Sequence, residues 1–139
     1  MPPPAGLYLT REQMEVILQH AQHELPDEAC GLLGGLDGRV QKVYPLPNAQ
    51  RSSVYYEAEP QALLAAILEM ESHGWEPVPL GIYHSHPYSE AYPSATDVKL
   101  AYYPDAVYLI VSPTRYDQPT VRAFRIVAGQ VTEEQVIIE

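Results

Sequence analysis

The chain of 139 residues contains a single cysteine, Cys30. One thiol excludes an internal disulfide and any zinc or iron–sulfur site built from several cysteines. The sequence also lacks an apolar run of about 18 residues, so no membrane-spanning helix is expected. Its first six residues, MPPPAG, have neither a basic start nor an apolar stretch. We therefore expect no signal peptide and, by default, a cytoplasmic location.

Basic residues are scarce as well. Lys and Arg together number 8, against 18 Asp and Glu, which gives a formal net charge of −10. Nucleic acids and anionic membranes are bound through clustered Lys and Arg, so neither is expected as the main partner, whereas a protein with a basic face would be compatible. Apolar residues make up 46% of the chain, enough for a hydrophobic core, and the length suits one domain, residues 1–139. The sequence gives no indication of the oligomeric state.

Three helices are predicted. Apolar residues at a helical spacing follow a capping box formed by Thr10 and Gln13, so the first helix is predicted over residues 10–25. Pro60 is placed to open a second helix, which Gly74 would cap. A third, short helix is predicted over residues 94–103.

Strands are predicted between and after these helices. Short runs of apolar or aromatic residues, bounded by turn residues, predict strands over 29–35, 39–45, 54–58, 77–86 and 106–112, and two more within 120–139. The dipeptide Asp37-Gly38 predicts a hairpin between the first two. The expected fold class is therefore α/β, with one mixed sheet and about three helices.

Two histidines end the strand predicted over residues 77–86. His84 and His86 would share one face of an extended strand, with backbones ~6.6 Å apart, so both imidazoles can reach one ion. Pro87 then turns the chain, and Asp97 returns a carboxylate at the start of the third predicted helix. Two nitrogen ligands and one oxygen ligand leave a fourth tetrahedral position for water, which is typical of a catalytic zinc site.

The same residues have a purely structural interpretation. Ser94 and Asp97 match an N-cap residue and the acidic residue of a helix cap, and the two histidines could be ordinary core or surface residues. Capping does not exclude metal binding, and the combination within one defined loop favours a metal site over a chance pair of histidines. Cys30 could approach the metal, but a small buried thiol is favoured. The remaining histidines lie near helix ends, have no partner pattern and are expected to be solvated: His20, His23 and His73.

The segment HSHPYSEAYPSATD (84–97) resembles the His-x-His-Pro-x(6)-Ser-x-x-Asp signature of the JAMM (MPN+, JAB-type) metalloprotease family. Upstream, LPDEACGLLGG (25–35) is similar to the segment in which this family places a catalytic glutamate, here Glu28. Residues 48–67 and 106–113 also resemble the family, so the resemblance covers nearly the whole chain. The short chain looks most like the compact prokaryotic members.

The resemblance implies a cytidine-deaminase-like three-layer α/β fold, the JAB/MPN domain, and one Zn²⁺. It makes His84, His86 and Asp97 the zinc ligands, Glu28 the general base, and Ser94 the hydrogen-bond donor to the oxyanion. The implied reaction is hydrolysis of peptide or isopeptide bonds at the C-terminal Gly-Gly tail of ubiquitin-like or sulfur-carrier proteins.

Two other protein classes compete with this interpretation. A non-catalytic MPN-type interaction scaffold would be expected to lack ligands of the signature, and here none is missing. A zinc nucleoside deaminase would need His-x-Glu and Pro-Cys-x-x-Cys, and the chain has neither. The scaffold therefore remains as the alternative.

Overall fold

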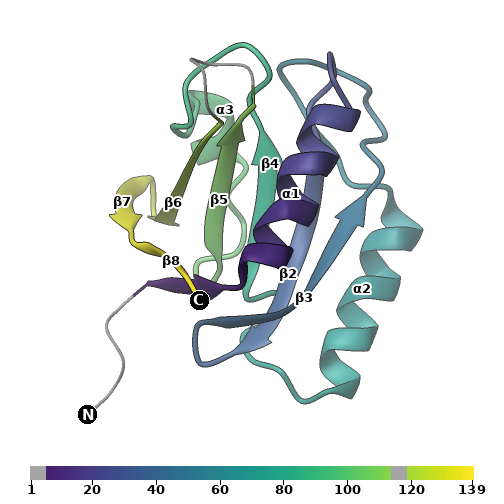
Figure 1. Cartoon of the computed structure of the whole chain (residues 1–139), viewed down its shortest axis with the longest axis vertical. Helices are drawn as coiled ribbons and strands as arrows, with labels where there is room; N and C mark the ends of the chain where they lie inside the picture. Colours follow the sequence, from purple (N-terminus) through teal and green to yellow (C-terminus); the bar gives the residue numbers. More distant parts are fainter. Residues whose placement is uncertain (1–5, 114–118) are drawn as a thin grey trace.

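The computed structural model describes residues 6–113 and 119–139. In this part of the chain, an eight-stranded mixed sheet in the order β7-β6-β5-β4-β2-β3-β1-β8 lies among three helices (Figure 1). The elements are β1 (Leu7–Leu9), α1 (Arg11–His23), β2 (Cys30–Leu36), β3 (Arg39–Leu46), α2 (Pro60–Ser72), β4 (Gly81–Ser85), α3 (Ala95–Lys99), β5 (Val107–Ser112), β6 (Thr120–Val127), β7 (Gln130–Glu134) and β8 (Val136–Ile138).

The helices form two outer layers. Ile17 and Ala21 of α1 pack with Leu33 and Leu109 in a core on one face of the sheet. On the other face, Ala66 and Met70 of α2 and the half-buried Val98 of α3 pack in a second core. This helix–sheet–helix arrangement with three helices confirms the predicted α/β fold (Figure 1).

The predicted helix start and the predicted hairpin turn are also confirmed. The N–H of Gln13 donates to Thr10 Oγ1 at 3.1 Å, and the N–H of Thr10 donates to Gln13 Oε1 at 2.9 Å, which completes the capping box. Asp37 and Gly38 have φ of 55° and 76°, the left-handed pair that a type I′ hairpin turn requires. The turn between β6 and β7 also has two residues with positive φ, Ala128 and Gly129.

Several predicted boundaries are wrong. Residues 54–58 form no strand, and one isolated bridge, between Asn48 and Ala58, is their only sheet-like pairing in the structure. The strand predicted over 77–86 is confined to β4, because Pro77 and Pro79 have no N–H to donate to a neighbouring strand.

Two further segments differ from the prediction. The helix predicted over 94–103 ends at Lys99, and the N–H of Tyr103 donates instead to the hydroxyl of Tyr108 at 3.2 Å. Residues 120–139 form three strands rather than two, because Gln135 separates β7 from β8. The strand β1 has three residues, too few for a period to be recognised, and was not predicted.

The C-terminal strands link the two ends of the sheet. β7 pairs with β6, whereas β8 pairs in parallel with β1 at the opposite end of the strand order (Figure 1).

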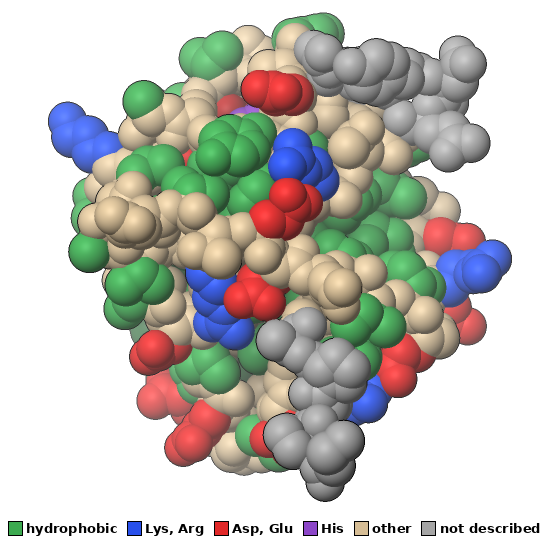
Figure 2. All heavy atoms as spheres, turned by 90° about the vertical axis from the view of Figure 1, so that its left-hand side faces the viewer, with side chains coloured by type: hydrophobic (Ala, Val, Ile, Leu, Met, Phe, Trp, Pro, Cys, Tyr) green, Lys and Arg blue, Asp and Glu red, His purple; other side chains and the backbone are tan. Residues whose placement is uncertain are grey.

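Figure 2 shows the molecule from the left-hand side of Figure 1, where positive and negative side chains lie next to one another. Between β6 and β7, Arg122 forms an ion pair with Glu133 and Arg125 forms one with Glu134. Residues 1–5, part of the segment expected not to be a signal peptide, lie outside the described residues. No helix in the described part of the chain is long and apolar enough to cross a membrane.

A glycine on β2 allows the strand that carries His84 to pack closely. Gly31 pairs with Tyr83 of β4, and a Cβ at position 31 would lie 2.3 Å from the buried Tyr83 ring. We predict that Gly31→Ala lowers the free energy of unfolding by about 1–3 kcal/mol through overpacking. Urea titration would measure this, with Gln41→Ala at an exposed position of β3 as the control, expected to change it by less than about 0.5 kcal/mol. Equal stability of the two variants would contradict the prediction.

Candidate metal centre and active site

The two histidines of the signature converge. His84 lies on β4, and His86 follows the end of the strand, but its N–H still donates to the carbonyl of Val111 at 2.7 Å and so extends the pairing with β5. Both side chains therefore stay on the same side, and their Nε2 atoms lie 3.2 Å apart. The two residues are 1% and 6% exposed.

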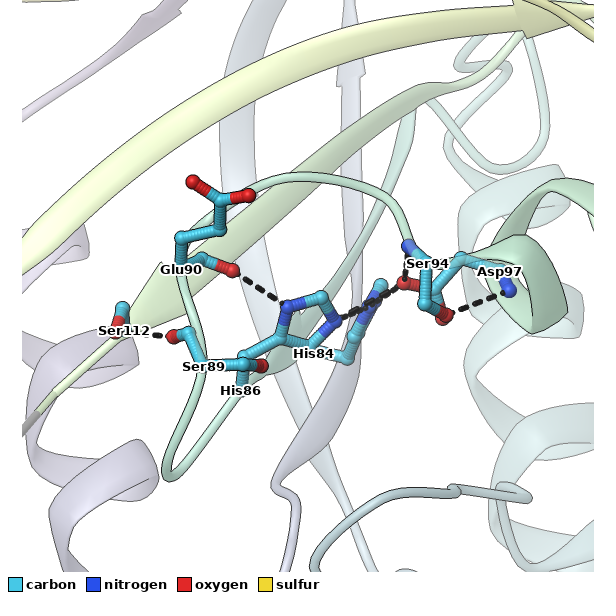
Figure 3. Close-up of polar contacts among 7 residues, drawn as sticks. All are labelled: His84, His86, Ser89, Glu90, Ser94, Asp97 and Ser112. Atoms are coloured by element: carbon cyan, nitrogen blue, oxygen red, sulfur yellow. Dashed lines mark hydrogen bonds and ion pairs between the residues drawn. The ribbon is translucent and has the colours of Figure 1, made fainter.

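Asp97 reaches the same point from α3 (Figure 3). Its N–H donates to Ser94 Oγ at 3.0 Å, and its Oδ2 accepts the N–H of Ser94 at 2.8 Å, which is the predicted helix cap. The same Oδ2 lies 3.0 Å from Nε2 of His86 and 3.2 Å from Nε2 of His84. The cap thus holds the carboxylate in place against the two imidazoles.

The three atoms have a spacing that suits a metal ion. They form a nearly equilateral triangle with sides of 3.0 to 3.2 Å. Ligands in tetrahedral coordination with bonds of ~2.0–2.1 Å lie ~3.3 Å apart, so the triangle matches one small divalent cation. His86 Nδ1 lies 2.8 Å from the carbonyl of Glu90, so when the imidazole binds a cation in its neutral form, the N–H would be held at Nδ1 and the lone pair of Nε2 would face the cluster (Figure 3).

His84 is supported differently. Its Nδ1 is buried without a hydrogen-bond partner among the described residues, so no hydrogen bond holds the ring on the side away from the cluster. The ring of Tyr56 stacks on it instead, with centroids 4.6 Å apart and planes inclined by 22°. Burial lowers the pKa of His84, which keeps the imidazole neutral and able to bind a cation.

Glu28 faces the histidines from the segment between α1 and β2. A carboxylate oxygen of Glu28 and a ring nitrogen of each histidine, His84 and His86, all lie within 4.8 Å of one another. The residue is 2% exposed, and its Oε1 has no hydrogen-bond partner among the described residues. Burial raises the pKa of Glu28 to about 8, while His86 lowers it and Asp97 raises it. A bound cation would lower this pKa, so the group can exchange protons near neutral pH.

The carboxyl group of Asp97 has the opposite electrostatic environment. Burial alone would raise its pKa, but hydrogen bonds from His84 and His86 outweigh burial and hold the pKa well below the usual range. At His86, burial lowers the pKa, but the bonds to Asp97 and to the Glu90 carbonyl outweigh burial and raise it. Asp97 is therefore an anion at neutral pH, as a metal ligand must be.

Ser94 and Cys30 are the remaining residues that the sequence singled out near the metal. Ser94 is exposed, and because its oxygen accepts the N–H of Asp97, the cap does not use its hydroxyl hydrogen. Cys30 is buried, with Sγ 3.8 Å from the carbonyls of Leu46 and Pro47, and burial raises the pKa of its thiol to about 12. It is not part of the Glu28–histidine cluster, which agrees with the buried thiol favoured from the sequence.

Of the three histidines expected to be solvated, His23 and His73 are exposed and His20 is not. His20 is half-buried, and its Nδ1 lies 2.8 Å from the hydroxyl of Tyr83. His73 stacks on Trp75 with ring centroids 4.3 Å apart. Both partners are distant in sequence or outside the helix, so helix-end position alone could not reveal them.

A cavity of about 420 Å³ adjoins the candidate centre at Asp97. Its floor includes Leu32 and Ile82 of the sheet, and one wall is the loop segment 54–58 that was predicted as a strand. The lining is mainly apolar and aromatic, as in sites that bind part of a substrate. No pattern in the sequence predicts this cavity, since its residues come from separate segments of the chain.

The fold and the candidate metal centre are those of a known protein family. The chain matches the family model for prokaryotic homologs of the JAB domain over residues 10–127, and it belongs to that family. Among its relatives is the CysO-cysteine peptidase of Mycobacterium tuberculosis, 42% identical over 132 residues that cover 94% of this chain and 89% of the relative. The desampylase of Haloferax volcanii is 40% identical over 114 residues, covering 77% and 81%.

Solved structures agree with this assignment. The solution structure of a Desulfitobacterium hafniense protein is 42% identical, covers 96% of this chain and 92% of that chain, and superimposes with a TM-score of 0.84. A JAB1/MPN domain protein from Archaeoglobus fulgidus has the same fold, with a TM-score of 0.63 at 23% identity over 95% and 98% of the two chains. The predicted JAB/MPN fold and the family are thereby confirmed.

The raised pKa of Glu28 predicts a pH effect on the chelator-treated protein. Its pKa is about 8 in the folded chain against a usual 4.5, so folding favours the protonated acid. This stability is fully present below pH 4.5 and is lost as the pH rises towards 8. Glu28→Gln should remove the effect, so the stability of this variant relative to wild type should increase between pH 5 and 8.

Urea titration at several pH values would measure that difference, and titrations common to both proteins largely cancel in it. A matched change at an exposed site, Glu12→Gln on α1, controls for the substitution itself. A flat difference for Glu28→Gln would show that the Glu28 carboxyl titrates normally.

Proposed function

We propose that this protein is a zinc-dependent hydrolase that cleaves peptide or isopeptide bonds at the C-terminal Gly-Gly tail of ubiquitin-like or sulfur-carrier proteins. The observation that carries the proposal is the triangle of His84 Nε2, His86 Nε2 and Asp97 Oδ2, with sides of 3.0 to 3.2 Å. The carboxylate of Glu28 faces this triangle from a buried position. A single domain of residues 1–139 and a cytoplasmic location are parts of the same proposal.

His84, His86 and Asp97 would hold the metal. Two imidazoles and one carboxylate suit zinc, and three protein ligands leave a position for water or substrate. When bound, a zinc ion supplies Lewis acidity, which polarises a carbonyl oxygen and lowers the pKa of water towards ~7. The cost of burying Asp97 is offset by the two histidines and would be offset further by the cation.

Glu28 would transfer the protons, and Ser94 would stabilise the negative charge that develops on the carbonyl oxygen. Glu28 accepts the proton of the attacking water and later delivers it to the amine of the leaving group, so one carboxyl group acts in both steps. The Ser94 hydroxyl donates to the oxyanion that develops on the carbonyl oxygen. Water and the amide are thereby converted into a carboxylate and a protonated amine.

The substrate class is supported by the relatives. One relative is a CysO-cysteine peptidase and another is a desampylase. The chain covers most of the length of both, and it has all residues of the signature. We propose as substrate a ubiquitin-like sulfur carrier joined through its C-terminus to cysteine or to another protein.

A direct test combines metal analysis with cleavage. The zinc-loaded protein is incubated with a ubiquitin-like sulfur carrier bearing a C-terminal cysteine, and mass spectrometry detects the released carrier. Glu28→Ala should keep zinc but lose about 100- to 10,000-fold in turnover, because the general base is gone. His84→Ala should lose both zinc and turnover.

His73→Ala, away from the cluster and stacked on Trp75, is the control and should retain zinc and activity. Chelation should stop cleavage, and added zinc should restore it. A metal-free, inert wild-type protein would favour the non-catalytic scaffold, and full activity of Glu28→Ala would remove Glu28 from its proposed role.

Ser94 gives a separate prediction. Ser94→Ala should lower kcat about 100- to 1,000-fold, the usual loss for one oxyanion donor. It also removes a helix cap, a loss of about 1 kcal/mol of stability. Thr10→Ala removes the matching capping box of α1, away from the cluster, and controls for the stability loss alone. Comparable kcat values in the two variants would leave Ser94 with capping only.

A further inference from the structure

The loop between β3 and α2 closes on the side chain of Asn48. Asn48 Nδ2 donates to the carbonyls of Glu28 at 3.0 Å and of Tyr55 at 3.1 Å. Its Oδ1 accepts the N–H groups of Gln50 and Glu57, each at 3.0 Å. An amide has two donor hydrogens and two acceptor lone pairs, so all four positions are used and the network defines which atom is nitrogen.

The same loop holds both backbone polar groups of Glu28. The N–H of Glu28 donates to the carbonyl of Ser52 at 2.7 Å, and its carbonyl accepts from Asn48. Glu28 precedes β2, so sheet pairing does not fix its backbone directly. On the other side, the N–H of Ala29 donates to Ser85 Oγ at 2.8 Å. The direction of the Glu28 side chain therefore depends on the loop and on β4 together.

This loop also contacts the candidate centre and the cavity. Tyr56 stacks on His84, and residues 54–58 form one wall of the cavity of about 420 Å³. Tyr55 and Glu57, whose backbones bond to Asn48, belong to that wall. One side chain thus connects the wall of the cavity with the backbone of Glu28.

We infer that Asn48 is a positioning residue, which fixes the carboxylate of Glu28 and the adjacent cavity wall in one arrangement. The inference rests on the proposed function, in which Glu28 is the general base. Asn48 touches no reacting atom and acts through Glu28 and the loop. Displacing a base or a bound substrate by about 1 Å can reduce turnover by as much as about 100-fold. Loss of the four hydrogen bonds of the Asn48 side chain should therefore lower the rate.

The sharpest variant is Asn48→Asp. Aspartate has nearly the same size and keeps the acceptor oxygen, but it replaces the two N–H donors by lone pairs that face the carbonyls of Glu28 and Tyr55. We expect kcat to fall about 10- to 100-fold and KM to rise, with zinc content unchanged. Gln50→Ala is the control: it removes a side-chain bond to Glu57 within the same loop and should leave kcat within about 2-fold.

A double variant tests whether Asn48 acts through Glu28. In a Glu28→Gln background the general base is absent, so adding Asn48→Asp should change the residual kcat by less than about 2-fold. The same fold-loss in both backgrounds would mean that Asn48 acts independently of Glu28, which would overturn the inference. Wild-type kcat in the Asn48→Asp variant would overturn it as well.

Amide hydrogen exchange gives a readout that needs no substrate. In the wild-type protein the N–H groups of Glu28, Gln50 and Glu57 should open with a common free energy, as one unit. In Asn48→Asp, the amide of Glu28 should exchange at least about 10-fold faster, whereas the amide of the buried Leu109 should not change.

Independent opening of Glu28 in the wild type would overturn the inference even if Asn48→Asp failed to fold. A failure of this inference can be distinguished from a failure of the proposed function. A wild-type protein that cleaves nothing would refute the hydrolase, whereas the exchange measurement decides whether Asn48 couples the loop to Glu28.

Discussion

The pairing of β4 on both of its edges is the constraint on which the candidate centre depends. β2 lies antiparallel to one edge, with Cys30 opposite His84, and β5 lies parallel to the other, with Ile110 opposite His84. The backbone bond from His86 to Val111 extends this pairing past the strand. With two rigid neighbours, the strand cannot slip in register, because a slip of one residue would turn both histidines to the opposite face of the sheet.

Two carboxyl groups near the histidines have pKa values displaced in opposite directions. Hydrogen bonds hold Asp97 as an anion, whereas burial favours the protonated form of Glu28. Such a separation is the pattern by which active sites assign different roles to like groups. The division follows from local contacts: Asp97 faces both imidazoles, and the Oε1 atom of Glu28 has no hydrogen-bond partner among the described residues.

Short-range sequence patterns predicted the elements that carry the candidate ligands. Contacts between distant residues explain where the structure differs from the prediction. The capping box of Ser94 and Asp97 and the exit of β4 at Pro87 are short-range patterns, so the sequence could predict their geometry. The loop at residues 54–58 has strand-like composition, but Asn48 satisfies backbone groups that a neighbouring strand would otherwise bond. No periodicity reveals a side chain that bonds to residues up to 20 positions away. The proposed roles of Glu28 and Ser94 rest on the family resemblance, because an isolated carboxylate or hydroxyl carries no spacing signal.

Because β4 has a partner on each edge, an incoming polypeptide cannot extend the sheet beside His84. Its main chain must find hydrogen-bonding groups in the connecting segments that surround the centre, those after β3 and after β4. The segment after β3 contains Asn48, which bonds to Glu28, and the segment after β4 contains His86 and Ser94. The loops that would meet the main chain of a substrate are therefore the same loops that hold the centre, so a change in either loop that alters recognition also disturbs the chemistry.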